Sequence, residues 1–248
     1  MVSMEEQAVP LSDLRGAVHG LLDSSAASVA DAVFRILRQA IIRMVLAPGA
    51  RLTEQELADG LSVSRQPVRE ALLRLREARL VRVVPRGSFV ARISIPDVET
   101  AQFVREAIET AIVRRAGTGL ALHETELLRD ILRRQDLARH AGDAGAFFTL
   151  DEEFHRTLAA TAGCAPAWAT IELVKAHMDR VRYLSLPTAT PIERLIAQHR
   201  AILDGIVGRD PEAAALAMQA HLREIVSSLP RLAREHAPLF EQAMTAGN

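Results

Sequence analysis

The chain has 248 residues, of which 49% are hydrophobic and 25% are charged, and its formal net charge is −1. This composition is typical of a soluble globular protein with one large domain or two small ones. No apolar run approaches the roughly 18 residues that span a bilayer, and the acidic N-terminus differs from a signal peptide. The single cysteine, Cys164, excludes an intrachain disulfide and fits a reducing compartment. We therefore expect a cytoplasmic protein without membrane contact.

The charge is distributed unevenly along the chain. Residues 27–93 contain 12 arginines but only 6 acidic residues, whereas the segments on either side are acidic overall. This asymmetry is expected when only part of a chain meets a polyanion such as DNA. A solvated helix face also carries many charges, so the positions of the arginines must decide between the two interpretations.

The first predicted domain, residues 27–93, begins with three helices. Apolar residues follow a helical spacing over residues 29–41, and the Pro-Gly pair at 48–49 ends that helix in a turn. Residues 53–56, "TEQE", form a capping box that begins a second helix. A short break follows, and Ser64 caps a third helix.

A hairpin completes this domain. Two short β-rich runs surround Pro85-Arg86-Gly87, which is a turn signal. Three helices followed by a hairpin predict a winged helix-turn-helix. Residues 1–26 before it are predicted to be a flexible tail, and residues 94–97 after it a short linker.

The rest of the chain, residues 98–248, is predicted to be an all-α bundle, so the fold class is mainly α. Its apolar spacing indicates helices separated by short breaks. The predicted helices cover residues 97–116, 123–141, 144–162, 165–185, 191–208, 210–228 and 231–244.

The start of the third helix carries the side chains suited to reading DNA. In a helix-turn-helix, the first turn of the second motif helix enters the major groove. Arginine can form a bidentate pair with guanine, glutamine can do so with adenine, and a serine at the helix start suits phosphate. A glycine at the hairpin tip permits close approach to the minor groove or the phosphate backbone. The predicted DNA contacts are Ser64, Arg65, Gln66, Arg69, Arg86 and Gly87.

These arginines also fit a solvated surface, with Arg69 paired to Glu70 or Glu77. However, "RLTEQELADGLSVSRQPVREALLRLREARLVRVVPRGSFV", residues 51–90, resembles the DNA-binding domain of the GntR family of bacterial transcription regulators. The resemblance implies that the segment binds double-stranded DNA. Ser62 departs from the usual glycine and Gln66 from a common threonine; the glutamine can change the preferred base without threatening the fold.

A second set of candidate residues lies in the helical part. "LDEEFHRTLAATAG" places Asp151 and His155 four residues apart, on one face of a helix. His199 and His221 each occupy the middle of another amphipathic helix. Imidazole and carboxylate ligands from three helices suit a divalent ion such as zinc, nickel or iron. The same residues also fit a hydrogen-bonded polar core, and their spacing does not separate the two interpretations.

Residues 97–230 resemble the helical, FCD-type effector-binding domain of the FadR-like branch of the GntR family. The similarity rests on "VREAIETAIVRRA", "DEEFHRTLAATAG" and "QHRAILDGIVGRDPEAAALAMQAHL". It implies a bound divalent metal, for which we expect zinc, with nickel, manganese or iron as alternatives. The positions that match the family's metal ligands are Asp151, His155, His199 and His221.

The same resemblance implies a small effector, a carboxylate, in the open coordination positions of the metal. Arg105 would face that cavity, although it can instead pair with Glu109 one helical turn later. Arg182 falls near the same region and is the second candidate for effector binding.

Three classes of function compete at this point. A metallohydrolase needs a positioned general base, but Glu152 and Glu153 point away from the Asp151 face, and known hydrolase motifs are missing from the sequence. A purely architectural DNA binder leaves the four polar residues unexplained. We therefore expect a ligand-responsive transcription regulator and not an enzyme. It should form a homodimer through residues 98–248 and bind a palindromic operator.

Overall fold

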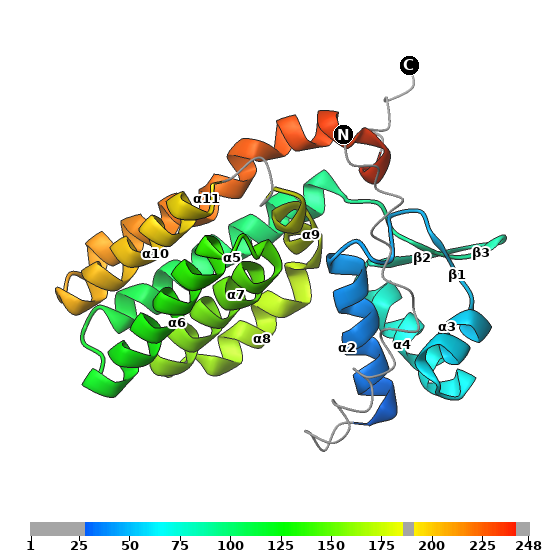
Figure 1. Ribbon diagram of the computed structural model, residues 1–248, viewed down its shortest axis with the longest axis horizontal. Coiled ribbons are helices and arrows are strands. Elements are labelled where there is room, and N and C mark those ends of the chain that lie inside the picture. The colour runs from blue at the N-terminus through cyan, green and yellow to red at the C-terminus, as the bar shows by residue number, and fades with distance from the viewer. Residues whose placement is uncertain (1–27, 186–190, 242–248) are drawn as a thin grey trace. The chain divides into compact units, whose positions relative to one another are not determined.

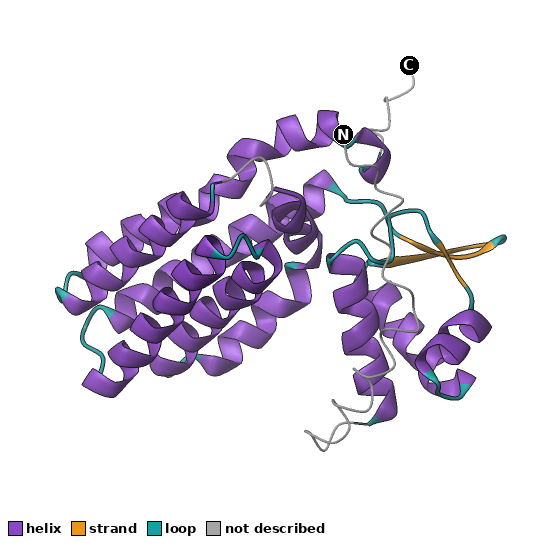
Figure 2. Ribbon diagram, viewed as in Figure 1, coloured by secondary structure: helices purple, strands orange, loops and turns teal. Residues whose placement is uncertain are grey.

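The structure is a computed structural model that describes residues 28–185 and 191–241. The predicted flexible tail lies outside these described residues. The chain forms two compact units, one comprising residues up to Ser94 together with those from His236 onward, and the other Ile95–Glu235. Among the described residues, strands occur only in the first unit (Figure 2). The predicted fold class, a winged helix-turn-helix followed by an all-α bundle, is confirmed.

The first unit combines helices with a three-stranded antiparallel sheet in the order β1-β3-β2 (Figure 1). Its elements are α2 (Val29–Ile42), β1 (Arg51–Leu52), α3 (Glu54–Leu61), α4 (Arg65–Glu77), β2 (Val81–Val84), β3 (Gly87–Val90) and the 3₁₀ helix η3 (Ala237–Leu239). Strands β2 and β3 form the predicted hairpin, with Val84 opposite Gly87. Strand β1, which pairs Arg51 with Phe89, was not predicted because two residues carry no alternating pattern.

The helix-turn-helix depends on how α3 ends and α4 begins. Thr53 caps α3 as predicted, since its Oγ1 accepts a hydrogen bond from the Glu56 amide at 3.2 Å. Ser62 ends α3 in the left-handed conformation, with φ of 57°, which costs a non-glycine residue about 1–2 kcal/mol. Ser64 is at the N-cap position of α4, but its side chain does not make the expected capping hydrogen bond. The sharp turn at Ser62 lets α4 begin at Arg65.

The core of the first unit lies between α2 and α4, which pack against each other. Val33 and Ile41 of α2 and Val68 and Leu75 of α4 are completely buried. This contact fixes α4 by its inward face, so the opposite face and the first turn remain open to solvent.

Residues 236–241 belong to the first unit, whereas the prediction placed them in the helical domain. Ile93 donates its backbone N–H to Leu239 at 2.9 Å and accepts one from Glu241 at 2.9 Å. These bonds form an isolated parallel bridge, a long-range pairing that periodicity does not reveal.

The second unit is a bundle of helices (Figure 1). They are α5 (Ile95–Ala116), α6 (Leu122–His140), α7 (Ala144–Thr161), α8 (Ala165–Val174), α9 (Ala176–Ser185), α10 (Ile192–Val207) and α11 (Pro211–Glu235). Helix α5 begins within the predicted linker, with Pro96 in its first turn, where a missing N–H is tolerated.

Two predicted helix boundaries in this unit were wrong. The predicted helix over 165–185 is interrupted at Lys175, whose buried ammonium group contacts Glu152 and Asp179. The predicted break near residue 229 is absent, because α11 continues through Pro230 to Glu235. Proline removes one helical hydrogen bond, but Leu229 and Leu232 on either side are buried and hold the helix in place.

Helix α11 packs along α5 and α10, and a glycine permits its closest approach to α10. A Cβ atom at Gly205 would lie 2.6 Å from the backbone nitrogen of Ala214. The two nearest atoms, N and Cα of Ala214, both belong to the backbone. The two helices would therefore have to separate to admit even a methyl group. This contact sets the spacing of the two helices that carry His199 and His221.

Gly205→Ala should therefore lower the free energy of unfolding by about 1–3 kcal/mol, a typical cost of overpacking. Gly145→Ala is the matched control, because a Cβ there meets only an ordinary 3.5 Å contact with Asp143. It should be neutral or stabilising, since alanine is favoured over glycine in a helix. Urea denaturation of both variants measures the difference. Equal stability of the two variants would show that the α10–α11 spacing does not depend on Gly205.

Candidate functional site

The predicted DNA contacts of α4 lie together on its exposed first turn. Ser64, Arg65, Gln66 and Arg69 are all solvent-exposed. The backbone N–H groups at a helix start lack intrahelical partners and carry partial positive charge, which suits a phosphate. This turn therefore brings together, on one surface, groups whose chemistry suits phosphate and base edges.

Glu54 of α3 holds both arginines in the absence of DNA. It accepts two hydrogen bonds from Arg69, at 3.0 Å each from Nε and Nη2, and one from Arg65 Nη2 at 3.2 Å. The alternative that Arg69 pairs with Glu70 or Glu77 is therefore wrong; Glu70 instead accepts a hydrogen bond from Gln66 at 3.0 Å. The hydrogen bond from Arg69 is the main cause of the lowered pKa of Glu54. Exposed ion pairs of this kind are weak, so the arginines can exchange Glu54 for DNA.

The wing places its predicted contacts at the turn between β2 and β3. Arg86 is exposed, and Gly87 has φ of 129°, a conformation that side chains disfavour. A Cβ at Gly87 would also lie 3.5 Å from Nε of Arg51 on the neighbouring strand. Glycine at this position therefore adds no side chain between Arg86 and Arg51.

The four predicted metal ligands converge in the second unit. Asp151 and His155 come from α7, His199 from α10 and His221 from α11, and one ligand atom of each lies within 4.8 Å of all the others. His221 Nε2 lies 3.1 Å from His155 Nε2 and 3.3 Å from His199 Nε2. His199 Nε2 lies 3.5 Å from Asp151 Oδ1. All four side chains are buried.

Each imidazole is anchored by an acceptor at its other nitrogen. His155 Nδ1 lies 2.5 Å from Glu109 Oε2. His199 Nδ1 lies 2.9 Å from Gln135 Oε1, and His221 Nδ1 lies 3.1 Å from Gln198 Oε1. An acceptor at Nδ1 places the imidazole proton there and leaves the Nε2 lone pair directed inward.

The orientation of both glutamines is itself fixed. Gln135 donates through Nε2 to the carbonyl of Leu150 at 3.2 Å, and Gln198 donates through Nε2 to Glu224 at 3.2 Å. Each amide therefore turns its oxygen toward the histidine. The sequence carries no signal for this role of Glu109, Gln135 and Gln198. Each lies on a different helix from the histidine it orients, so no spacing along the sequence connects the two.

Nε2 of His221 lies at hydrogen-bond distance from Nε2 of both other histidines, but lone pairs cannot hydrogen-bond to each other unless one nitrogen is protonated. Oδ1 of Asp151 is buried beside them without a hydrogen-bond partner. A divalent cation would satisfy all four atoms, and three imidazoles with one carboxylate match the ligand preferences of zinc and of similar ions. The residues thus fit a metal, and the anchoring acceptors complete the arrangement found around metal-binding histidines.

The electrostatics also favour neutral imidazoles. Burial, followed by the neighbouring His155, lowers the pKa of His199 well below its usual value. Burial, followed by His199, does the same for the pKa of His221. Burial alone would raise the pKa of Glu109, but the nearby Arg105 and His155 hold it well below its usual range. At neutral pH, His199 and His221 are therefore neutral, and Glu109 beside His155 is ionised.

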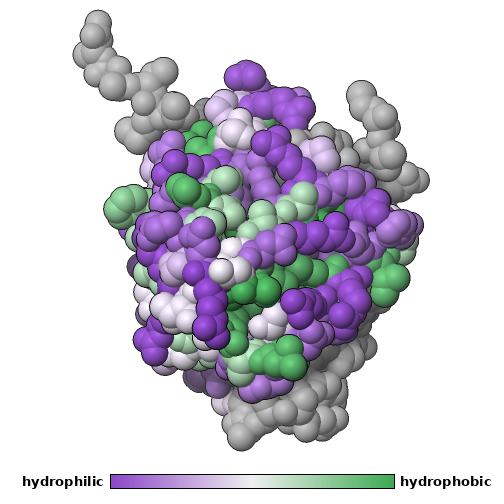
Figure 3. All heavy atoms as spheres, turned by 90° about the vertical axis from the view of Figure 1, so that its left-hand side faces the viewer, coloured by the Kyte–Doolittle hydropathy of each residue, from purple (hydrophilic) through white to green (hydrophobic). Residues whose placement is uncertain are grey.

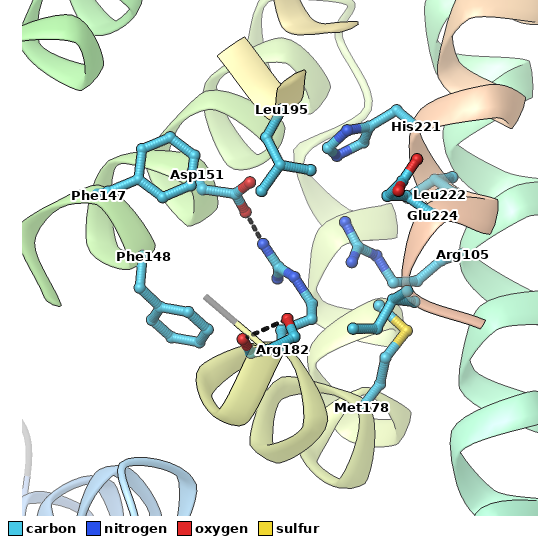
Figure 4. A pocket seen from close by; sticks show the side chains of 12 residues that line it. Arg105, Phe147, Phe148, Asp151, Met178, Arg182, Leu195, His221, Leu222 and Glu224 are labelled. Carbon is cyan, nitrogen blue, oxygen red and sulfur yellow. Dashed lines mark hydrogen bonds and ion pairs between the residues drawn. The ribbon is translucent and has the colours of Figure 1, made fainter. Parts of the chain in front are cut away.

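A pocket opens beside this cluster (Figure 4). Arg105 and Arg182, the two residues predicted to bind an effector, both line it, together with the apolar side chains Phe147 and Phe148. The predicted alternative for Arg105 is present as well, since its Nε donates to Glu109 at 2.5 Å. Its Nη2 is buried without a hydrogen-bond partner. Arg105 therefore keeps a donor available to a ligand.

Other histidines of the described chain do not join the cluster. His177 lies 3.8 Å from Asp97, and His123 and His140 are exposed. Among the residues that the structure describes, the group of possible metal ligands is that of Asp151, His155, His199 and His221.

A winged helix-turn-helix joined to a helical domain with a buried polar centre defines a class of DNA-binding regulators. Residues 29–90 match the bacterial regulatory proteins of the gntR family, and residues 101–224 match the FCD domain. The HTH-type transcriptional repressor RspR of Escherichia coli (strain K12) is 40% identical over 211 residues, covering 85% of this chain and 92% of RspR. The chain therefore belongs to the GntR family of transcription regulators and carries an FCD domain.

Other relatives agree with this assignment. An uncharacterized HTH-type transcriptional regulator of Streptomyces ambofaciens is 40% identical over 207 residues, covering 83% of this chain and 86% of its own. A putative GntR regulator structure from Rhodococcus sp. RHA1 has a TM-score of 0.69 at 27% identity, covering 82% of this chain and 99% of its own. E. coli McbR/YncC shares the fold, with a TM-score of 0.73 at 22% identity over 83% of this chain and 98% of its own.

The predicted family is thus confirmed, and the protein is a DNA-binding transcription regulator and not an enzyme. In the part of the chain that the structure describes, no helix has the length and apolarity needed to cross a membrane.

Arg65→Ala should weaken binding to a specific DNA site by about 1–3 kcal/mol and relax base preference, because it removes one bidentate donor. The probe is a duplex selected by the unmodified protein from a randomised library, measured at constant salt. Arg76→Ala is the control, since it removes the same charge from the exposed last turn of α4. Equal losses in the two variants would mean that Arg65 contributes only general electrostatic attraction.

Proposed function

We propose that operator binding by this regulator responds to a divalent metal ion, with zinc as the first choice, and to a small carboxylate effector. The observation that carries the proposal is the convergence of Asp151, His155, His199 and His221, with three imidazole lone pairs held inward. Nickel, manganese and iron accept the same ligand types. The metal would supply open coordination positions beside the cavity.

The cavity supports an anionic effector. Arg105 and Arg182 both line it, and arginine recognises carboxylates through paired N–H donors. The phenylalanines and Leu195 offer apolar contact to the remainder of a small molecule. An effector carboxylate can therefore contact the metal and an arginine together.

In the DNA-binding unit, we assign residues 27–93 to operator recognition in the cytoplasm. The first turn of α4 would enter the major groove, and the wing would contact the minor groove or the phosphate backbone. The residues assigned to these contacts are Ser64, Arg65, Gln66, Arg69, Arg86 and Gly87.

The operator would be palindromic and bound by a homodimer that forms through the helical unit. Several large apolar side chains of this unit are exposed, among them Phe103, Leu122 and Leu173, each by more than two thirds. Figure 3 shows hydrophobic side chains between polar ones on one face of the unit.

Sedimentation of the full chain at micromolar concentration should give the mass of two chains; a strict monomer would exclude this part of the proposal.

An effector that prefers one arrangement of the dimer changes its affinity for DNA, and DNA must change effector affinity by the same factor. Regulation therefore needs no chemistry at the metal. The ion would only organise the cavity and polarise its ligands.

Elemental analysis should find about one divalent ion per chain after purification without chelator, and chelation should lower the melting temperature. His199→Ala should abolish retention of the ion, whereas His123→Ala, at an exposed histidine of α6, should not. Because imidazole binds metal only when neutral, the bound fraction should fall as pH drops below about 6. The lowered pKa values of His199 and His221 keep both ligands neutral at pH 7 and move the loss of metal toward lower pH.

A protein that purifies without metal, and whose melting temperature is unchanged by zinc, nickel and manganese, would contradict this proposal. The four residues would then form a hydrogen-bonded polar core. Effector binding would have to depend on the two arginines alone.

A further inference from the structure

A guanidinium group in the cavity contacts the carboxylate that the metal would need as a ligand. Nη2 of Arg182 contacts Oδ2 of Asp151, and Figure 4 shows Arg182 reaching across the cavity from α9 to this oxygen. The other oxygen of Asp151, Oδ1, faces His199 and has no hydrogen-bond partner. One carboxylate therefore faces the imidazole cluster on one side and an arginine on the other.

This contact neutralises the buried charge of Asp151, whose side chain is inaccessible to solvent. A buried carboxylate without a cation is strongly destabilising. Burial, followed by the positive charge of Arg105, lowers the pKa of Arg182 to about 9, so the guanidinium remains protonated at neutral pH. Arg182 thus performs for Asp151 the charge compensation that a metal ion would otherwise perform.

We propose, on the basis of the metal site inferred above, that Arg182 competes with the metal for Asp151, and that metal binding releases Arg182 to receive an anionic group of the effector. A divalent ion at Oδ1 would draw the carboxylate charge toward itself and repel the guanidinium at Oδ2. Most of the electrostatic attraction that holds Arg182 on Asp151 would then be lost.

The other carboxylates near the released guanidinium are already paired with other groups. Glu109, whose charge acts on Arg182, pairs with Arg105 and His155. Asp179 Oδ1 lies 3.5 Å from Arg182 Nη1, but its Oδ2 is already 2.5 Å from the buried ammonium group of Lys175. Glu224, at the edge of the cavity, is paired with Arg194 at 3.0 Å. A free Arg182 beside the unpartnered Nη2 of Arg105 therefore makes the cavity attractive to an anion.

Packing lets Arg182 change partners without leaving the cavity. Its guanidinium carbon lies 5.3 Å from the ring centre of Phe148, which can support the side chain through a cation–π contact. The consequence is an order of binding: the metal comes first, and the effector follows. Metal and anion then bind with positive cooperativity, since each removes one partner from the Arg182–Asp151 pair.

A purely structural ion pair makes the opposite prediction for metal affinity. If Arg182 only supports the geometry of Asp151, its removal should weaken metal binding or leave it unchanged. If it competes with the metal, its removal should strengthen binding. The sign of the change therefore separates the two roles.

The experiment measures zinc affinity of the full-length protein by competition with a fluorescent chelator. Arg182→Gln should bind zinc at least about tenfold more tightly than the unmodified protein, because a buried ion pair no longer has to break. Arg134→Gln is the matched control: it removes a guanidinium group from an exposed pair with Glu153, also on α7, at 2.8 Å. Its zinc affinity should be unchanged.

Equal or weaker zinc binding by Arg182→Gln, with Arg134→Gln unchanged, would overturn the competition. Zinc binding by neither Arg182→Gln nor the unmodified protein would instead overturn the metal site itself. Binding by the variant alone would support the competition in its strongest form.

A second measurement does not depend on the folding of a variant. In the unmodified protein with isotope-labelled arginine, zinc should shift the guanidinium NMR signal of Arg182 toward that of a mobile arginine. The signal of Arg134 should stay in place. A zinc-saturated protein in which the Arg182 signal does not move would also overturn the proposal.

Discussion

The helical unit depends on neutralising one buried carboxylate, Asp151, among three imidazoles. A polar group left unpaired in such a core is costly, because burial without a partner costs more free energy than one hydrogen bond returns. The unit meets this constraint with side chains from several helices: Glu109 of α5, Gln135 of α6 and Gln198 of α10 each orient one histidine. The same helix packing that forms the bundle therefore also holds the side chains of the site in place.

The DNA-binding unit solves a related problem at its surface. There a single carboxylate, Glu54, holds Arg65 and Arg69, but both arginines are more than half exposed. Water screens this pair, so that it costs little to separate. The buried pair of Arg182 and Asp151 can separate only if another charge replaces each partner. The exposed ion pair thus exchanges its partners easily, whereas the buried one changes partners only when other charges take their places.

The sequence predicted the features that local patterns encode. Apolar periodicity and turn residues placed most helices and the hairpin, and the (i, i+4) spacing placed Asp151 beside His155 on α7. Long-range contacts left no such pattern: strand β1, the inward turn of Lys175 and the contact of Arg182 with Asp151 all join distant segments. The convergence of the histidines came from a family resemblance, because spacing alone also fitted a polar core.

The path of the chain limits how the helical unit can influence DNA binding. The chain passes between the two units at the start of α5 and again after the end of α11. Both helices contribute to the buried centre, since α5 carries Arg105 and Glu109, and α11 carries His221. A ligand that favours one arrangement of these side chains therefore acts on the two helices that continue into the DNA-binding unit. Linkage then requires only that the two arrangements differ in their affinity for the operator.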